Sequence, residues 1–216
     1  MRPHVVAVAL ALIVATASTA PAQPPPPAAP APLPRPRGVQ VMTLDSPAWP
    51  DGGALPLRHS QAGRDGSPPL SWSGAPEGVV SYVLVMRDLD ALTPAGEDTL
   101  HWLVWNIPGA RTALSAGLPP GNAPPAPPRF GGGSPSAPSD GPRQISATGP
   151  GYRGPAAPAS GPAHHYAFEL FALDRWIDVP AVGQSPAATH AAVAAAMAGH
   201  VRGKGVRVAT FRRPAP

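Results

Sequence analysis

The sequence predicts a mainly β domain, arranged as a β-sandwich with one helix near its carboxyl end. From Gly38 onward the apolar residues recur in short runs separated by Gly, Pro, Asp and Ser, which is typical of strands joined by turns. Only one segment carries the signals of a helix. Of the 216 residues 43% are hydrophobic, enough for one core, and 13% are charged. A highly charged disordered chain is therefore excluded.

The first 37 residues are expected to lie outside that domain. Residues 1–22 resemble a secretory signal peptide, with Arg2 at a short basic start, an apolar run from Val5 to Ala17, and small residues on both sides of Pro21 before the predicted cleavage site. The apolar run is too short to span a bilayer, which takes about 20 residues. The proline-rich residues 23–37 predict an extended linker. We therefore expect an exported protein, periplasmic or secreted, with no transmembrane segment after cleavage.

The predicted strands are six to nine residues long, and the nearly continuous apolar runs among them indicate strands that are buried on both faces. The first, Val39–Leu44, instead alternates between apolar and polar residues. Trp72, Trp102 and Trp105 are expected in the core. In chain order the strands are Val39–Leu44, Val79–Arg87, His101–Ile107, Tyr166–Leu173 and Val206–Arg212.

The single helix is predicted near the carboxyl end. Ser185 is a suitable N-cap and Pro186 a suitable first helical residue, and Ala-rich sequence continues to about Val201. Gly203 and Gly205 would then end the helix. Residues 123–146, in contrast, form a Pro/Gly-rich insertion with no signal of secondary structure.

Composition excludes several functions. The chain has no Cys, so disulfides, thiolate metal sites and cysteine catalysis are ruled out. The net charge is +4, and one basic cluster, formed by Arg202, Lys204, Arg207, Arg212 and Arg213, lies at the carboxyl end. Without interleaved aromatics or a known module, this cluster is interpreted as a solvated edge strand and tail, so no nucleic-acid partner is expected.

Common catalytic motifs are also missing from the sequence. It contains no G-x-S-x-G, H-E-x-x-H or P-loop pattern. Residues 149–154 do read G-x-G-x-x-G, but Pro155 and Pro158 follow in place of a helix, so this segment is expected to be a loop and not a dinucleotide site.

Strand geometry brings a small set of polar residues together. Side chains alternate between the two faces of a strand, so Asp88 and Asp90 are expected to point the same way, as are His164 and Tyr166, with His165 pointing away. His101 begins the next predicted strand about ten residues after Asp90. A hairpin would therefore place it near one of the two carboxylates.

Three chemistries could use these residues. The imidazoles and the phenol could donate hydrogen bonds to an anion, with a carboxylate fixing the histidine tautomer; an amine-bearing phosphate ester would then suit the site better than inorganic phosphate. His101, His164 and Asp88 could instead form a two-His-one-carboxylate metal site. General acid–base hydrolysis is the third possibility.

A series of motifs along the chain resembles the phosphatidylethanolamine-binding protein family, and most closely its bacterial, Raf-kinase-inhibitor-like branch. The resemblance covers about residues 38–213. The motifs, in order, are Ser67–Trp72, Gly74–Gly78, Asp88–Ala91, His101–Trp102 with Asn106–Pro108, Gly151–Tyr152 with Gly154–Pro155, His164–Tyr166, and Ala196–His200.

The resemblance implies a β-sandwich with a small pocket at one end for phosphate-like anions and phospholipid head groups. The residues that match the family's pocket motifs are Asp88, His101, His164, Tyr166, Pro155 and Pro158. This sequence also departs from the family pattern. Leu89 and Leu92 replace both prolines of D-P-D-A-P, Ala157 replaces a wall proline, and His165 replaces the Arg of H-R-Y.

Three functions follow as hypotheses. The first is an exported binding module that holds a phosphate-containing small molecule or lipid head group in this pocket, without turnover, cofactor or metal. The second is an inhibitor or regulator of an exported protease or other enzyme, acting through the same end of the sandwich, as in relatives that inhibit kinases and proteases. The third is a metal-dependent hydrolase, because fold alone does not settle function.

Overall fold

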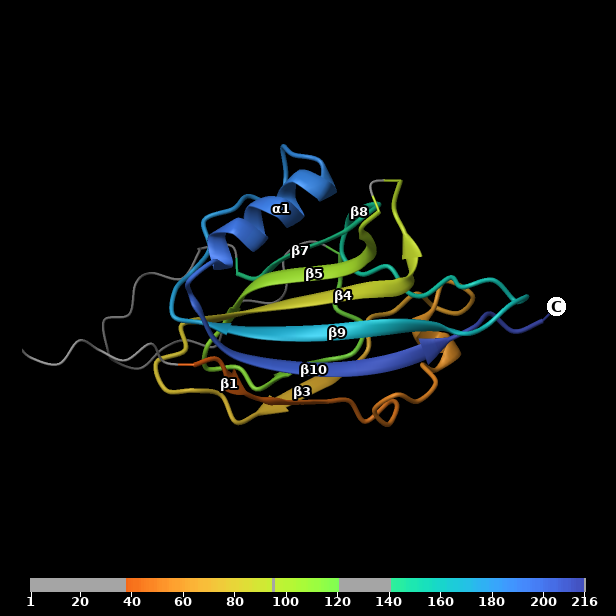
Figure 1. Ribbon diagram of the computed structural model, residues 1–216, viewed down its shortest axis with the longest axis horizontal. Coiled ribbons are helices and arrows are strands. Elements are labelled where there is room, and N and C mark those ends of the chain that lie inside the picture. The colour runs from red at the N-terminus through yellow and green to blue at the C-terminus, as the bar shows by residue number, and fades with distance from the viewer. Residues whose placement is uncertain (1–37, 95, 121–140, 216) are drawn as a thin grey trace, which may run out of the picture. The chain divides into compact units, whose positions relative to one another are not determined.

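The computed structural model describes residues 38–94, 96–120 and 141–215, and these residues form the predicted β-sandwich (Figure 1). The strands are β1 (Gln40–Val41), β2 (Thr43–Asp45), β3 (Leu70–Ser73), β4 (Ser81–Leu92), β5 (Asp98–Pro108), β6 (Ala113–Leu114), β7 (Arg143–Ser146), β8 (Gly149–Pro150), β9 (His164–Leu173) and β10 (Val201–Phe211). A short 3-10 turn, η1, spans Leu57–His59, and one α-helix, α1, spans Pro186–Met197.

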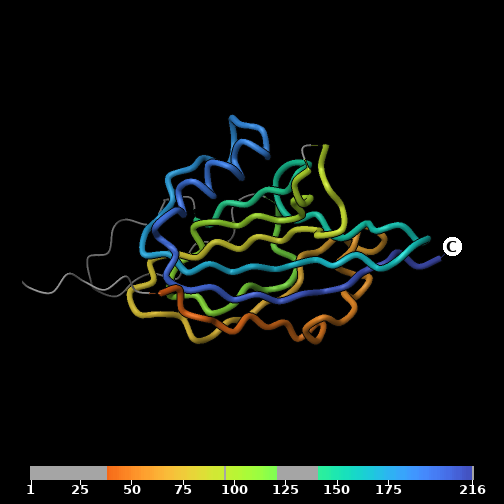
Figure 2. Tube along the Cα trace, in the orientation of Figure 1, coloured from red at the N-terminus to blue at the C-terminus, as the bar shows by residue number. Residues whose placement is uncertain are grey.

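The strands form a large and a small sheet. The large sheet has the order β1-β10-β9-β4-β5-β7-β8, and the small sheet has the order β2-β3-β6. The long strands β4, β5, β9 and β10 pair antiparallel. After β9 the chain forms α1 and returns as β10 beside β9 (Figure 2).

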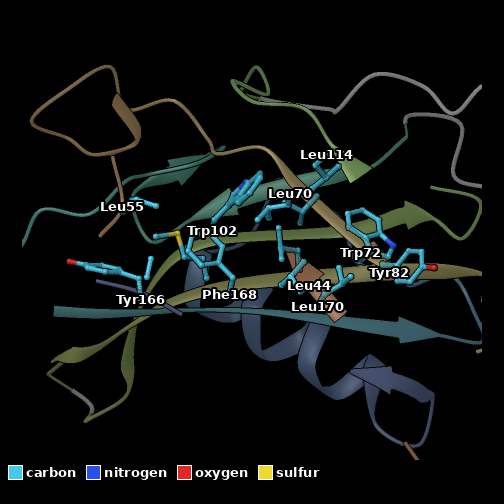
Figure 3. Close-up of a cluster of buried hydrophobic side chains, with 14 of the residues drawn as sticks. Leu44, Leu55, Leu70, Trp72, Tyr82, Trp102, Leu114, Tyr166, Phe168 and Leu170 are labelled. Carbon is cyan, nitrogen blue, oxygen red and sulfur yellow. The ribbon is translucent and has the colours of Figure 1, made fainter. Parts of the chain in front are cut away.

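The core lies between the two sheets and follows the alternation of each strand. In β4, for example, Tyr82, Leu84 and Met86 point toward the small sheet. They pack there against aromatic and aliphatic side chains of the neighbouring strands, several of which are drawn in Figure 3. Trp72 and Trp102 belong to this core, as predicted. The intervening residues of β4, Val83 and Val85, belong to a second apolar cluster on the other face, with Trp105 and side chains of α1.

The predicted first strand, Val39–Leu44, is divided into two. β1 pairs with β10 in the large sheet, whereas β2 pairs with β3 in the small sheet. The buried Met42 lies between them, and its backbone N–H donates to the carbonyl of Lys204. The chain crosses from one sheet to the other at this point, which the apolar alternation alone could not indicate.

The helix ends earlier than predicted, and the last strand begins earlier. α1 ends at Met197, because Ala198 leaves the helical conformation and Gly199 has a positive φ of 76°. Gly203 and Gly205, interpreted as helix-ending residues, lie inside β10 instead. A Cβ at Gly203 would lie 2.8 Å from the sulfur of Met42 and 2.9 Å from Cδ of Pro76, so the side chains packed on this point of β10 leave little room for a larger residue.

The predicted insertion at 123–146 is not wholly irregular. Its last residues form β7, which pairs with β5 at Leu103, Val104 and Trp105. Residues 121–140 lie outside the described part of the chain, as do the predicted signal peptide and linker. The short strands β3, β6 and β8 were also missed, because two to four residues are too few to show the alternation of apolar and polar residues that marks a strand.

The basic cluster at the carboxyl end is not simply a solvated edge. β10 lies between β1 and β9, and Arg207 is buried, where it donates to a carboxylate oxygen of Asp45 and to the carbonyl of Trp49. Its neighbours Arg202 and Lys204 form ion pairs with Asp174 and Glu169. These cations stabilise the sheet, and only Arg212 and Arg213 match the predicted exposed tail.

Candidate functional site: a pocket at one end of the large sheet

A pocket of about 430 Å³ lies where β4 ends and β5 and β9 begin. This volume is within the range of about 300–1,000 Å³ that small-molecule sites occupy. Three strands supply polar residues, and loops complete the wall. The lining residues include Asp88, His101, His164, Gln61, Arg153 and Pro158.

Asp88 and His164 form the centre of the site. The register of β4 against β9 places Asp88 opposite Tyr166, so its carboxylate lies beside His164. The Nδ1 of His164 is 2.9 Å from Oδ2 and 3.2 Å from Oδ1 of Asp88. Because a carboxylate only accepts hydrogen bonds, Nδ1 of His164 carries a hydrogen and its Nε2 is left for a ligand.

His101 approaches the same carboxylate from β5, as the predicted hairpin required. Its Nε2 lies 4.0 Å from Oδ2 of Asp88, and its Nδ1 lies 2.8 Å from the carbonyl oxygen of Arg153. That Nδ1 therefore donates, and Nε2 carries no hydrogen in the neutral ring. Burial lowers the pKa of His101, although the carbonyl of Arg153 and the charge of Asp88 oppose this effect.

Tyr166 lies against the two imidazoles but is fully buried. Its ring stacks on His164 at a centroid distance of 6.5 Å and meets the edge of His101 at 5.2 Å. Among the described residues its hydroxyl has no hydrogen-bond partner, and burial, reinforced by the nearby Asp88, raises the pKa of Tyr166. Tyr166 thus contacts the pocket histidines without lining the pocket itself.

The two predicted wall prolines occupy different positions. Pro158 lines the pocket, whereas Pro155 is buried behind it and accepts the backbone N–H of Gln61 through its carbonyl. Gln61 also donates from its side chain to the carbonyl of Gly154, at 2.8 Å. A Cβ at Gly154 would lie 2.4 Å from the carbonyl oxygen of His59, so only glycine fits at this crossing.

The prediction that Asp88 and Asp90 point the same way is wrong. The register of β4 against β5 shifts between Asp88 and Leu92, and the backbone N–H of Asp90 donates to Oδ1 of Asp88. Asp90 instead bonds His165, whose Nδ1 lies 2.9 Å from Oδ2 of Asp90. The irregular end of β4 therefore directs two successive carboxylates to two successive histidines, and only the Asp88 pair lines the pocket.

Sequence reasoning missed Arg153 as a site residue. It lines the pocket, and its guanidinium makes no ion pair or hydrogen bond with the described residues. Its backbone is fixed by two contacts with His101: the N–H of Arg153 donates to the carbonyl of His101 at 3.0 Å, and its own carbonyl accepts from the imidazole. The only signal in the sequence was its place inside the motif from Gly151 to Pro155.

The geometry does not fit the metal alternative well. Within residues 38–94, 96–120 and 141–215, no three His, Asp or Glu side chains are arranged to hold a metal ion. The Asp88 carboxylate, the third ligand in that hypothesis, is already bonded to His164 and to a backbone N–H. His190 and His200 do not share a helix either, because α1 ends before His200.

A family model described as phosphatidylethanolamine-binding protein matches residues 45–212, which include β3 to β10 and the residues that line the pocket. The chain belongs to this family. The resemblance found in the motifs of the sequence is thereby confirmed.

Relatives and solved structures agree with the family. A UPF0098 protein of Methanothermobacter thermautotrophicus is 36% identical over 80% of this chain and 99% of its own length. LppC of Mycobacterium tuberculosis, named as a candidate lipoprotein, is 33% identical over 79% of this chain and 72% of its own. The crystal structure of YbcL from E. coli, described as a member of the mammalian PEBP family, has a TM-score of 0.61 and 25% identity over 80% of this chain and 98% of that one.

The CT736 protein of Chlamydia trachomatis, described as a PEBP homologue, is similar to the same extent. Its TM-score is 0.60 at 25% identity, over 81% of this chain and 99% of that one. In the part of the chain that the structure describes, no helix is long and apolar enough to cross a bilayer.

Proposed function

We propose that this protein is exported and binds a phosphate-bearing small molecule or lipid head group in the pocket, without converting it. Membership of the phosphatidylethanolamine-binding protein family supports a ligand-binding role. Export is supported by the signal-like residues 1–22 and by the name of the relative LppC. The observation that carries the proposal is the convergence of Arg153 and the Nε2 atoms of His101 and His164 on one pocket.

Arg153 supplies the permanent positive charge for an anion. Its guanidinium has no partner among the described residues, and phosphate oxygens are suited to its planar set of donors. The carboxylate of Asp88 would repel an anion by itself, but its two oxygens are occupied by His164 and by the N–H of Asp90. Its role is to fix the tautomer of His164.

The histidines complete the anion site only when they hold a second proton. Both Nδ1 hydrogens are committed, to the carbonyl of Arg153 and to Asp88, so the neutral rings present lone pairs to the pocket. A dianion therefore draws a proton onto an Nε2 atom as it binds. A singly protonated phosphate ester can instead donate its own O–H to that nitrogen.

The described residues of the pocket offer a binding arrangement and no evident nucleophile. The hydroxyl groups among them belong to Thr99 and Thr148. The first donates to the carbonyl of Ala91, the second lies 3.3 Å from the hydroxyl of Ser146, and neither is bonded to a histidine that could activate it. Binding without turnover is the function that this arrangement supports.

Isothermal titration with phosphoethanolamine and with inorganic phosphate at about pH 6 tests this proposal. We expect saturable binding that Arg153→Gln weakens by about tenfold to a hundredfold, because a charge-assisted hydrogen bond contributes about 1.5–3 kcal/mol. His164→Ala is expected to abolish the measurable heat. Arg58→Gln removes an exposed charge outside the pocket and is the matched control.

Asp88 keeps acceptor capacity beside its bonds to His164 and to the N–H of Asp90, so phosphoethanolamine, whose ammonium can donate to it, should bind at least as tightly as glycerol phosphate. The proposed site would be contradicted if the wild type, Arg153→Gln and His164→Ala bound phosphoethanolamine with equal affinity. Absence of binding by the wild type would favour the alternative of an inhibitor that acts on an exported enzyme.

A further inference from the structure

A second hollow, of about 340 Å³, lies on the other face of the large sheet, beneath α1. Figure 1 shows α1 on this face, over the strands that form the floor. The floor consists of Val85, Leu103 and Phe171, and the helix contributes Val193 and Met197. None of its lining residues lines the pocket of Asp88, so the two sites are separate.

The composition of α1 explains why the hollow is there. The buried residues of the helix are Thr189, Val193 and Met197, which recur every four positions and form a single row on the sheet. On one side of this row the hollow is bordered by Ala194, and beyond the helix by Gly199. Such short side chains cannot reach the sheet, so apolar surface on the floor is left without the close packing of a protein interior.

The charged groups around the hollow balance one another. Glu169 forms ion pairs with Arg87 and with Lys204, and the Lys204 Nζ lies 2.6 Å from its carboxylate. Arg87 also pairs with Asp98, at 3.5 Å between nitrogen and oxygen. Although burial opposes the ionisation of Glu169, the hydrogen bonds from Lys204 and Arg87 lower its pKa, so it remains an anion. Arg87 and Lys204 are thus paired with Glu169 and Asp98, and Glu97 also acts on His190, so a charged ligand would have to displace an existing partner of one of these groups.

His190 is the polar group that remains for a ligand. It projects from α1 into the lining, is half-buried, and makes no hydrogen bond with the described residues. Burial lowers the pKa of His190, and the charge of Arg87 lowers it further. At neutral pH the ring is therefore uncharged and presents one N–H donor and one nitrogen acceptor.

We propose that this hollow binds an uncharged, largely apolar small molecule, such as an aromatic alcohol, whose single hydroxyl bonds His190 while its ring packs on the partly exposed Phe171. The volume is at the lower end of the range of small-molecule sites, which suits one or two fused rings. This ligand differs in chemistry from the anion of the other pocket, and the two can be bound together.

NMR titration of the purified protein with 1-naphthol tests the proposal, with 1-naphthoate and 1-naphthylmethylamine as ligands of the same shape and opposite charges. We expect naphthol to shift the backbone amides of α1 and β5 saturably, and the two charged ligands to bind at least tenfold more weakly. Saturation with phosphoethanolamine should leave the naphthol affinity unchanged. Equal binding of naphthol and naphthoate would overturn the assignment, as would the absence of any shift in these elements.

Two variants locate the ligand. Ala194→Leu extends a side chain into the hollow and should abolish naphthol binding, whereas Ala191→Leu, at an exposed position of α1 outside the lining, should leave it intact. His190→Leu should weaken naphthol by about threefold to tenfold, the range expected for one neutral hydrogen bond. Wild-type affinity in a folded Ala194→Leu protein would show that naphthol binds elsewhere.

Discussion

Sulfate binding should depend steeply on pH, because sulfate brings no titratable proton to the pocket. The two histidine Nδ1 atoms already donate, so a sulfate oxygen can accept from an imidazole only after Nε2 takes up a proton. In the free protein burial lowers the pKa of His101, so this ring is neutral at pH 7. A bound dianion favours the charged ring and raises that pKa.

The magnitude follows from proton linkage. At pH values between the free and the bound pKa of His101, binding takes up one proton, and the affinity falls about tenfold, or about 1.4 kcal/mol, for each unit of pH increase. Below the free pKa the ring is already charged, and the affinity becomes constant. Phosphate monoesters should show a shallower dependence, because their own second pKa of about 6 allows the ligand to supply the proton.

The assay is isothermal titration with sulfate from pH 6 to 8, in two buffers of different ionisation enthalpy, so that proton uptake is counted directly. In His101→Gln the side-chain amide donates at every pH, and we expect the pH dependence to decrease strongly while some binding persists. A sulfate affinity that is constant over this range, with no proton uptake, would refute the role of the histidines and leave Arg153 as the anchor.

Three further predictions concern stability and can be checked by denaturant unfolding. Asn106 has a positive φ of 59° and exchanges two hydrogen bonds with the backbone of Ile177. Asn106→Ala should therefore lower the free energy of unfolding by about 2–5 kcal/mol. A loss below about 1 kcal/mol would contradict this role. Leu170→Ala should cost about 2–5 kcal/mol because the side chain is fully buried between the sheets, whereas Val206→Ala, at an exposed position, should cost much less. Ser185→Ala should cost about 1 kcal/mol, since its hydroxyl accepts the N–H of Ala188 at the start of α1, and an unchanged midpoint would argue against capping.

The sequence predicted the central strands well because their apolar runs reflect burial on both faces. In β4 the residues from Ser81 to Met86 are all buried, as are seven of the ten residues of β9, alternately by the small sheet and by the cluster under α1. The short strands of the small sheet and β7 form because they pair with segments that are distant in the sequence. The order of apolar and polar residues within such a strand does not indicate this pairing. β7 pairs with β5 across about 40 residues of sequence, and its apolar content is a single Ile145.

The site could be predicted where regular strand geometry determines it. The alternation of β9 correctly placed His164 and Tyr166 together, and the hairpin of β4 and β5 placed His101 near Asp88. Asp90 was misplaced because an irregular register at the end of β4 breaks the alternation. Arg153 could not be predicted in this way, since its position depends on backbone and side-chain hydrogen bonds to His101, 52 residues away in sequence.

The most direct test of the anion pocket is the protonation of the two pocket imidazoles, observed by ¹⁵N NMR during titration of the purified protein with sulfate at pH 7. In the free protein both rings should carry their hydrogen on Nδ1, and His101 should be neutral. On saturation, the Nε2 signal of at least one ring should move to the position of a protonated nitrogen, in step with the binding isotherm. Binding that leaves both Nε2 signals unchanged would contradict the account.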